Sequence, residues 1–289
     1  MLKTNIDKII KISVIGKVAS PTRRQNVRLT HQGEATVFPG TGGITYNVKV
    51  GDPVFGWAGD HIEPGVSVKN KDDIENRALN VYTCIGNTAY IVKSDNKEIQ
   101  DKTGVVTGKH GGIEHVLVWF PKTVIEKLTI GDKIQVRAQG QGLQVFDLPD
   151  VKFFNIDPNL FLKINPKNKN GVIEFPVTRI IPPTIMGSGL GSETAASGDY
   201  DITTQDPDMI KQCGLDKMRF GDIVYLENTD NTFGRCYKKG AGTVGIVVHA
   251  DCVIAGHGPG VTTIATSVKG KIKPVINKKA NIADYLQLK

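Results

Sequence analysis

The sequence predicts a mainly β protein, a short-stranded barrel or sandwich architecture with a few short helices. Glycine and proline are frequent, at 32 and 14 of 289 residues, and both favour turns over long regular elements. Apolar or alternating runs of strand length recur along the chain, whereas helix signals are few and short. Together these observations indicate many short strands joined by tight turns.

Nine segments have the apolar or period-two pattern of strands. They are residues 10–15, 44–50, 90–93, 116–120, 133–138, 172–177, 223–226, 244–254 and 261–267. Four short segments carry helix signals, such as a proline in the first turn. They are residues 72–79, 121–128, 206–213 and 281–286. A Gly-Asp pair recurs between apolar segments, at 51–52, 131–132 and 221–222, and is typical of turns at the corners of small β-barrels and sandwiches.

Turn-forming residues concentrate between about residues 140 and 170. We therefore predict an N-terminal β domain over residues 1–148 and a C-terminal β domain over 149–289, with one intertwined unit as the alternative. If there are two domains, the cleft between them is the natural ligand site.

Composition bounds the class of protein. A hydrophobic content of 39% and a charged content of 22% are ordinary for a soluble globular chain. Lys8 and Lys11 interrupt the first apolar stretch, so no signal peptide is expected, and no run approaches the length of a membrane helix. We expect a cytoplasmic protein with no membrane partner. The four cysteines are widely spaced without a CxxC pair, which argues against a disulfide framework or a zinc knuckle.

The net charge of +7 raises the question of nucleic-acid binding. Basic residues gather near residues 23–28 and 269–279, but no nucleic-acid motif or interleaved aromatic platform accompanies them. A solvated, lysine-rich surface is favoured over a nucleic-acid partner.

Three of the six histidines are bracketed by glycines, in residues 59–65, 108–112 and 256–260. Glycine gives a loop backbone conformations closed to other residues and lets a ligand approach closely. A titratable imidazole in such a loop is a candidate site. In the first segment, Asp60, His61 and Glu63 can serve as metal ligands or as an acid/base pair; a polar turn is the alternative.

The second segment combines Lys109 and His110 with Gly111 and Gly112. Its backbone amides can form an anion-binding nest, with Lys109 as a point charge, but the Walker spacing is missing. His110, expected in the loop, is a catalytic candidate. His115 is expected to share a strand face with Leu117 and to belong to the core.

The third segment is the predicted strand 244–254. Alternation assigns Cys252 to the apolar face and turns His249 and Asp251 together to the other face, as metal-ligand candidates or as a solvated pair. Cys252 is therefore not expected to be a nucleophile. In the loop that follows, His257 is a catalytic candidate and Gly258 a ligand-binding candidate.

A further glycine-rich segment, 187–192, precedes Asp199 and Asp201. Their carboxylates can face one way on a strand and ligate a cation, although a flexible hydrogen-bonded loop is the favoured interpretation. No HExxH, GxSxG, Walker or CxxC pattern is present. This combination suits a divalent-metal or acid/base site assembled from separate strands.

Four segments carry a resemblance to a known family. They are residues 39–43, 60–67, 108–112 and 256–260. They resemble an uncharacterised prokaryotic family that carries only a domain-of-unknown-function label. The resemblance extends over nearly the whole chain and implies a mainly β, multidomain structure of the kind solved by structural genomics, with no activity attached.

A second resemblance covers the C-terminal half. Residues 198–202 and 215–225 are similar to the acetamidase/formamidase family, which implies an amide-hydrolysing metalloenzyme. Where that family has an acidic glycine-rich segment, this chain has the basic segment 235–242, and the departure argues against amidase activity.

The leading hypothesis is a small-molecule site lined by His61, His110, His249 and His257 in a metal-assisted hydrolase or isomerase. Asp60, Glu63 or Asp251 would act as ligand or base. The cofactor is undetermined, and a divalent metal is compatible with these residues. The alternatives are a non-catalytic binding protein for a small anionic metabolite and an oligomeric scaffold, with a homo-oligomer left open.

Overall fold

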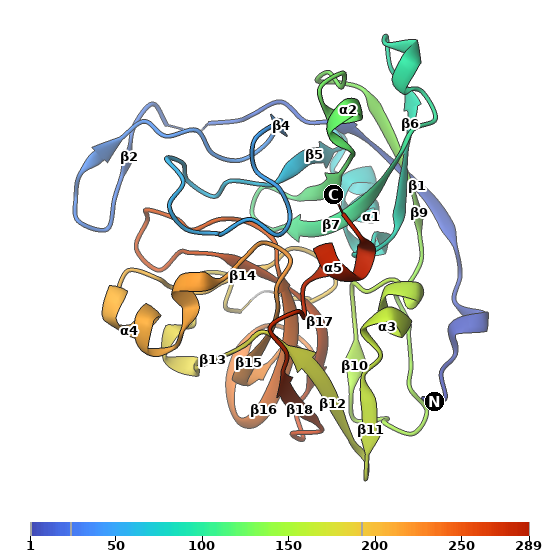
Figure 1. Ribbon diagram of the computed structural model, residues 1–289, viewed down its shortest axis with the longest axis vertical. Coiled ribbons are helices and arrows are strands. Elements are labelled where there is room, and N and C mark those ends of the chain that lie inside the picture. The colour runs from blue at the N-terminus through green and yellow to red at the C-terminus, as the bar shows by residue number, and fades with distance from the viewer. Residues whose placement is uncertain (1, 24, 192, 289) are drawn as a thin grey trace.

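The computed structural model describes residues 2–23, 25–191 and 193–288, and it is mainly β with about 15% helix. The predicted fold class is confirmed. Figure 1 shows one group of strands above and a second group below, joined by long loops. Among the described residues, no helix is long and apolar enough to cross a membrane.

Six antiparallel strands close a barrel in the N-terminal half. Their order is β1-β9-β6-β7-β8-β5, and β5 pairs back onto β1. The strands are β1 (Ile12–Val18), β5 (Gly65–Lys69), β6 (Thr88–Lys93), β7 (Thr103–His110), β8 (His115–Trp119) and β9 (Lys133–Ala138). Alternate residues fill the barrel, as along β9, where Ile134, Val136 and Ala138 are buried.

Short elements cover this barrel. The α1 helix (Asp73–Tyr82) begins at Asp72, whose carboxylate accepts from two backbone N–H groups in the first turn, and Leu79 packs against Gly16 of β1. The remaining elements of this half are short. They are η1 (Ile6–Lys8), β2 (Arg28–Leu29), β3 (Ala35–Thr36), β4 (Ile44–Thr45), η2 (Lys97–Ile99) and α2 (Lys122–Ile125).

The C-terminal half is built on a second sheet of order β10-β17-β16-β15-β13, with β14 added beside β17. Its strands are β10 (Lys152–Phe153), β13 (Arg179–Ile181), β14 (Tyr200–Asp201), β15 (Ile223–Asp230), β16 (Cys236–Val247) and β17 (Gly260–Ser267). The chain passes from the barrel to this sheet between β9 and β10, and the predicted boundary at residues 148–149 falls in that connection.

A small third sheet and several helices complete this half. The sheet contains β11 (Lys167–Lys169), β12 (Val172–Val177) and β18 (Ile272–Ile276). The helices are α3 (Pro158–Ile164), η3 (Pro183–Ile185), α4 (Pro207–Gln212), η4 (Leu215–Lys217) and α5 (Ile282–Leu286).

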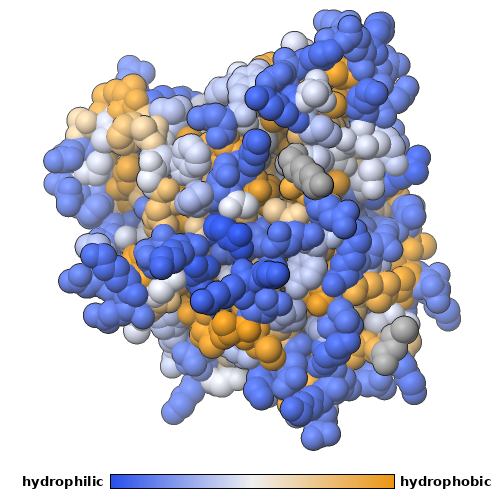
Figure 2. All heavy atoms as spheres, viewed as in Figure 1, coloured by the Kyte–Doolittle hydropathy of each residue, from blue (hydrophilic) through white to orange (hydrophobic). Residues whose placement is uncertain are grey.

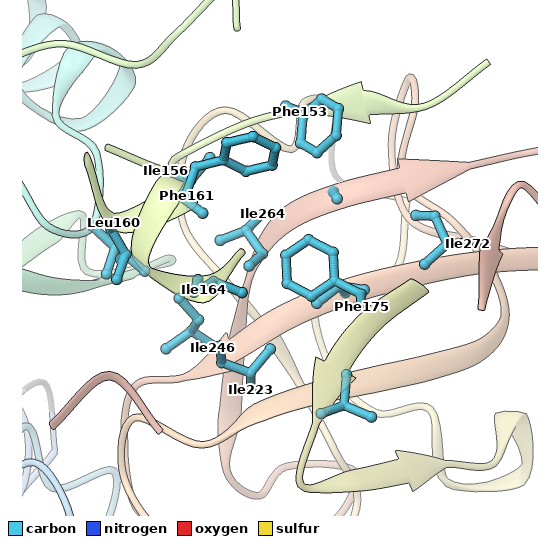
Figure 3. Packing of buried hydrophobic residues seen from close by; sticks show 14 of the residues in the cluster. Phe153, Ile156, Leu160, Phe161, Ile164, Phe175, Ile223, Ile246, Ile264 and Ile272 are labelled. Carbon is cyan, nitrogen blue, oxygen red and sulfur yellow. The ribbon is translucent and has the colours of Figure 1, made fainter. Parts of the chain in front are cut away.

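One hydrophobic core lies beneath the second sheet and reaches into the first half. Figure 3 shows Phe161 of α3 beside Phe153 of β10, with Ile264 of β17 below them. The two phenyl rings pack edge to face, with their centroids 5.3 Å apart. Ile85 and Leu117 of the N-terminal half belong to the same cluster. The two halves therefore share buried packing.

Figure 2 shows hydrophilic side chains over most of the viewed surface, with separate apolar patches between them. Single exposed apolar side chains such as Ile10 and Phe233 are scattered along the chain. Isolated residues of this kind are normal on soluble proteins.

Two strand predictions were too long. The predicted strand 44–50 is reduced to β4, and the strand predicted to reach residue 254 ends at Val247. Beyond that point, the backbone N–H groups of Ala250 and Asp251 donate to carbonyls of the N-terminal half, at Ile62 and Val54. The chain thus leaves its own sheet to bond with the other half, which local alternation cannot reveal.

Candidate metal centre

Four of the six histidines converge in one cluster, and they come from both halves of the chain. The ring centroids of His110 and His249 are 4.2 Å apart. Those of His61 and His249 are 5.1 Å apart, and those of His61 and His257 are 5.2 Å apart. His61, His110 and His249 are buried, while His257 is half-buried. The glycine-bracketed segments therefore meet at one place.

Each histidine is placed by a different element. His110 is the last residue of β7, opposite His115 of β8, so it lies at a strand end and not in the loop where it was predicted. His61 precedes β5 and has a φ of 53°, a left-handed conformation that is uncommon for a non-glycine residue. His249 lies just beyond β16, and His257 lies in the loop that leads to β17.

Two aspartates complete the cluster. Asp199 and Asp201 flank Tyr200 at β14, which pairs with β17 and so brings both carboxylates to the histidines. His249 Nε2 is 2.8 Å from Asp199 Oδ2 and 3.4 Å from Asp201 Oδ1. The other oxygen of Asp201, Oδ2, is 2.8 Å from His257 Nδ1. The Asp-Tyr-Asp alternation was the sequence signal for this pair, and a flexible loop had been preferred.

Surrounding acceptors orient two of the imidazoles. Glu63 lies 2.5 Å from His110 Nδ1 and also accepts from the backbone of Gly42 and the hydroxyl of Ser67. His249 Nδ1 lies 2.9 Å from the carbonyl of Ala250. A proton on Nδ1 satisfies each contact, so Nε2 is the ring atom that faces the cluster and can bind a cation. Such outer partners orient metal-bound histidines in proteins.

Asp60 has the same relation to His61, with Oδ1 3.1 Å from Nδ1. Its other oxygen is paired with Arg28. Glu63 is likewise fully occupied, because His115 Nδ1 lies 3.0 Å from both of its oxygens. The structure therefore places these two predicted metal ligands around the cluster, as acceptors that hold histidines. His115 is buried, as expected for a core residue.

One pair of atoms in the cluster is unsatisfied. His249 Nε2 and Asp199 Oδ2 lie 2.8 Å apart, yet neither has a hydrogen bond to any described residue. The other oxygen of Asp199 is held by the backbone N–H of Gly111 at 2.7 Å. A side chain at Gly260 would place a Cβ 1.8 Å from Asp199 Oδ2 and 2.2 Å from His249 Nε2. Glycine is therefore required at position 260.

The electrostatics of the cluster favour a cation. Burial works to lower the pKa of His249, but Asp199 and Asp201 outweigh it and hold the pKa well above the ordinary value. Burial likewise opposes ionisation of both aspartates, but the neighbouring histidines hold their pKa values below the usual range. Both carboxylates are therefore ionised at neutral pH. The negative field that raises the imidazole pKa also attracts a divalent cation.

The donor atoms fall into two groups, each compact enough to hold a metal ion. His110, Asp199 and His249 offer ligand atoms within 4.8 Å of one another, and so do His61, Cys252 and His257. The first group contains the unsatisfied pair. In the second group, His61 Nε2 is 3.3 Å from His257 Nδ1, which also contacts Asp201. Imidazole and carboxylate donors of this kind suit ions such as zinc, iron or manganese.

Cys252 lies beside this second group, and its predicted place on an apolar strand face is wrong. The strand ends before it, and its Sγ donates to Asp60 Oδ1 at 2.9 Å. Burial and the carboxylate of Asp60 raise the pKa of the thiol. The thiol is therefore protonated, in agreement with the expectation that it is not a nucleophile.

Three other predicted residues point away from the cluster. The Nζ of Lys109 donates to Asn155 Oδ1 and to the carbonyl of Ala196, both at 2.8 Å, and burial lowers its pKa to about 8. Asp251 accepts from Thr204, so it does not pair with His249. The Cα of Gly258 packs against Ile202, where a Cβ would lie 1.9 Å from the carbonyl oxygen.

A cavity of about 260 Å³ opens onto the cluster. Its walls combine the site side chains with glycines and serines. It is lined by His61, His110, Gly111, Gly112, Glu114, Ser188, Gly189, Ser197, Gly198, Asp199, Asp201, Arg235 and His257. Gly111 and Gly112, which were predicted to bind a ligand, thus line this cavity. A larger cavity of about 580 Å³ shares none of these residues, but its wall includes Asp60 and Gly42, which contact His61 and Glu63, respectively.

Comparison with known proteins supports the near full-length resemblance. A protein whose crystal structure is named TM1086 is 47% identical, with a TM-score of 0.93 over 98% of this chain and 99% of that one. No protein of curated function matches, and the resemblance to acetamidase/formamidase gains no support. The family model for the N-terminal domain of unknown function DUF4438 matches residues 27–162, and that for its C-terminal domain matches 162–286. The chain therefore belongs to the DUF4438 family.

Proposed function

We propose that this protein is a hydrolase that depends on one divalent metal ion, held by His110, His249 and Asp199. The observation that carries the proposal is the unsatisfied contact between His249 Nε2 and Asp199 Oδ2. A buried carboxylate oxygen and a buried imidazole nitrogen this close need a positive charge between them, either a proton on Nε2 or a metal ion that replaces that proton. Two histidines and one carboxylate form a ligand set that leaves a coordination position open.

The residues around this group have distinct roles. Glu63 and the carbonyl of Ala250 hold Nδ1 of His110 and His249, so that both Nε2 atoms face the ion. Gly111 fixes Asp199 through one oxygen and leaves the other free. A bound divalent ion would lower the pKa of a water molecule in the open position.

The second group of donors supplies a proton acceptor beside that position. His257 is half-buried and lines the cavity, and Asp201 contacts its Nδ1 at 2.8 Å. A carboxylate at Nδ1 keeps the proton there and leaves Nε2 free to take a proton from water. His257 is thus the general base, Asp201 orients it, and His61 lies against both.

Metal analysis of protein purified without a histidine tag tests the proposal. We expect one ion per chain, lost in His249→Ala and Asp199→Asn. His31→Ala is the matched control, because His31 is exposed and lies outside the cluster. Hydrolysis of ester and amide substrates should fall in His257→Ala, with the metal retained. Wild-type protein that contains no stoichiometric metal and keeps its stability in chelator would refute the proposal.

A further inference from the structure

Arg235, in the wall of the same cavity, has a buried guanidinium group with unpaired donors. It precedes β16, is only 2% exposed and lines the cavity with His61 and His110. Its Nε and Nη2 atoms are buried, and neither has a hydrogen-bond partner among the described residues. These two nitrogens form one edge of the guanidinium plane. One complete donor edge is therefore free.

Neighbouring carboxylates do not satisfy this edge. Asp199 and Asp201 are close enough for their charges to act on Arg235, but no ion pair joins the guanidinium to a carboxylate of the described residues. A buried charge without hydrogen bonds is costly and is normally paired or occupied by a ligand. Packing alone gives no reason for an arginine here.

The walls beside Arg235 leave room for a ligand. Gly189 has a φ of 91°, and a Cβ there would lie 3.3 Å from Arg235 Nη1. Ser188 and Gly198, which are also small residues, line the same cavity. The complement of a guanidinium edge is a pair of oxygens in one plane, as in a carboxylate or a phosphate.

We propose that Arg235 binds the anionic group of the substrate, so that the substrate is a small molecule bearing a carboxylate or a phosphate. The assignment of this ligand as a substrate rests on the proposed function, but anion binding by Arg235 does not. Arg235 is the one lysine or arginine among the described residues that line this cavity. Lys109 was predicted to bind an anion, but its Nζ donates to Asn155 and to the carbonyl of Ala196 instead.

Calorimetric titration of the full chain with inorganic phosphate and with succinate, at constant ionic strength, tests this proposal. We expect saturable binding of at least one probe, and the preferred probe distinguishes a phosphate from a carboxylate ligand. Arg235→Gln should weaken that binding at least about tenfold, since charged pairs in enclosed sites contribute strongly. Arg77→Gln is the matched control, because it removes the same charge from an exposed position.

A conservative variant protects the test against a folding defect. Arg235→Lys keeps the charge but removes the two-nitrogen edge, so we expect intermediate affinity with an unchanged circular dichroism spectrum. Absence of saturable binding of either probe, or equal affinity in wild type and Arg235→Lys, would overturn the proposal.

Titrations before and after chelation separate the two proposals. Binding that depends on Arg235 in metal-free protein supports the inference even if no metal proves native. If binding is lost on chelation and is unchanged in Arg235→Gln, the anion binds to the metal ion and not to Arg235, and the inference is overturned.

Discussion

His249 Nε2 lies 2.8 Å from Asp199 Oδ2, and neither atom has a hydrogen-bond partner among the described residues. The contact joins the segment just after β16 to the residue just before β14, beside Gly260, the first residue of β17. The other polar atom of each side chain is bound by the backbone: Asp199 Oδ1 accepts from the N–H of Gly111, and His249 Nδ1 contacts the carbonyl of Ala250.

Gly260→Ala should weaken metal binding. The new methyl group would lie 1.8 Å from Asp199 Oδ2 and 2.2 Å from His249 Nε2, so at least one ligand must move. We expect affinity to fall at least tenfold, as for other changes that misplace ligands. Metal content after dialysis measures this. Gly240→Ala, with a positive φ but open space around it, is the control, and equal metal content in both variants would contradict the prediction.

Glu63→Gln should weaken metal binding and destabilise the fold. The carboxylate accepts from two histidines, a backbone amide and a hydroxyl, and an amide cannot satisfy all four donors. We expect about 10- to 100-fold weaker metal binding and a free energy of unfolding lower by about 3 kcal/mol. Urea unfolding and metal titration check both effects. The exposed Glu126→Gln should change neither.

Asp157→Ala should cost more stability than a helix cap alone. One oxygen of Asp157 caps α3 through Asn159 and Leu160, and the other accepts from Asn87 at 2.9 Å. We expect a loss of about 2 kcal/mol. Asp206→Ala is the comparison, because Asp206 caps α4 through backbone contacts only and should cost about 1 kcal/mol. Equal losses in urea unfolding would rule out a contribution from the contacts of the second oxygen with Asn87 and Gln139.

Cys84 should make stability fall with rising pH. Burial raises the pKa of its thiol from 9.0 to about 12, so above pH 9 the unfolded chain loses a proton that the folded chain keeps. The stabilisation is complete below pH 9 and is lost between pH 9 and 12. The stability difference between wild type and Cys84→Ala should therefore shift by about 1 kcal/mol between pH 9 and 10, to the disadvantage of wild type.

Urea unfolding across this pH range measures the difference. Lys109, which also titrates in this range, is present in both proteins, so its contribution cancels apart from its charge interaction with Cys84. A difference that does not change with pH would mean that the thiol ionises alike in both states.

Local patterns predicted the elements whose burial is set by their own sheet. The predicted strands 133–138 and 172–177 coincide with β9 and β12, where apolar residues alternate with half-buried or exposed ones. The prediction failed where the chain bonds to the other half, as after Val247. The α3 helix was missed because Asp157 and Pro158, taken as a turn, form its cap and first residue.

The sequence predicted the histidines of the candidate site better than the roles of its carboxylates and its arginine. Glycines on both sides singled out His61, His110 and His257, and the cluster contains all three. The roles of Glu63 and Asp199 depend on contacts with residues 47 and 88 positions away in the chain, respectively, at His110 and Gly111. Arg235 lies in a basic stretch that gave no sign of burial. Such pairings are set by tertiary packing.

The site draws His61 and His110 from the barrel half, and His249 and Asp199 from the other half. Neither half alone contains a complete set of donors. The binding site for an ion or anion exists only when the two halves are packed together as in the native fold. Binding therefore stabilises only that native state. The fraction of chains that bind the ligand then measures the fraction that is natively folded, because a chain whose two halves are not packed together has no complete site.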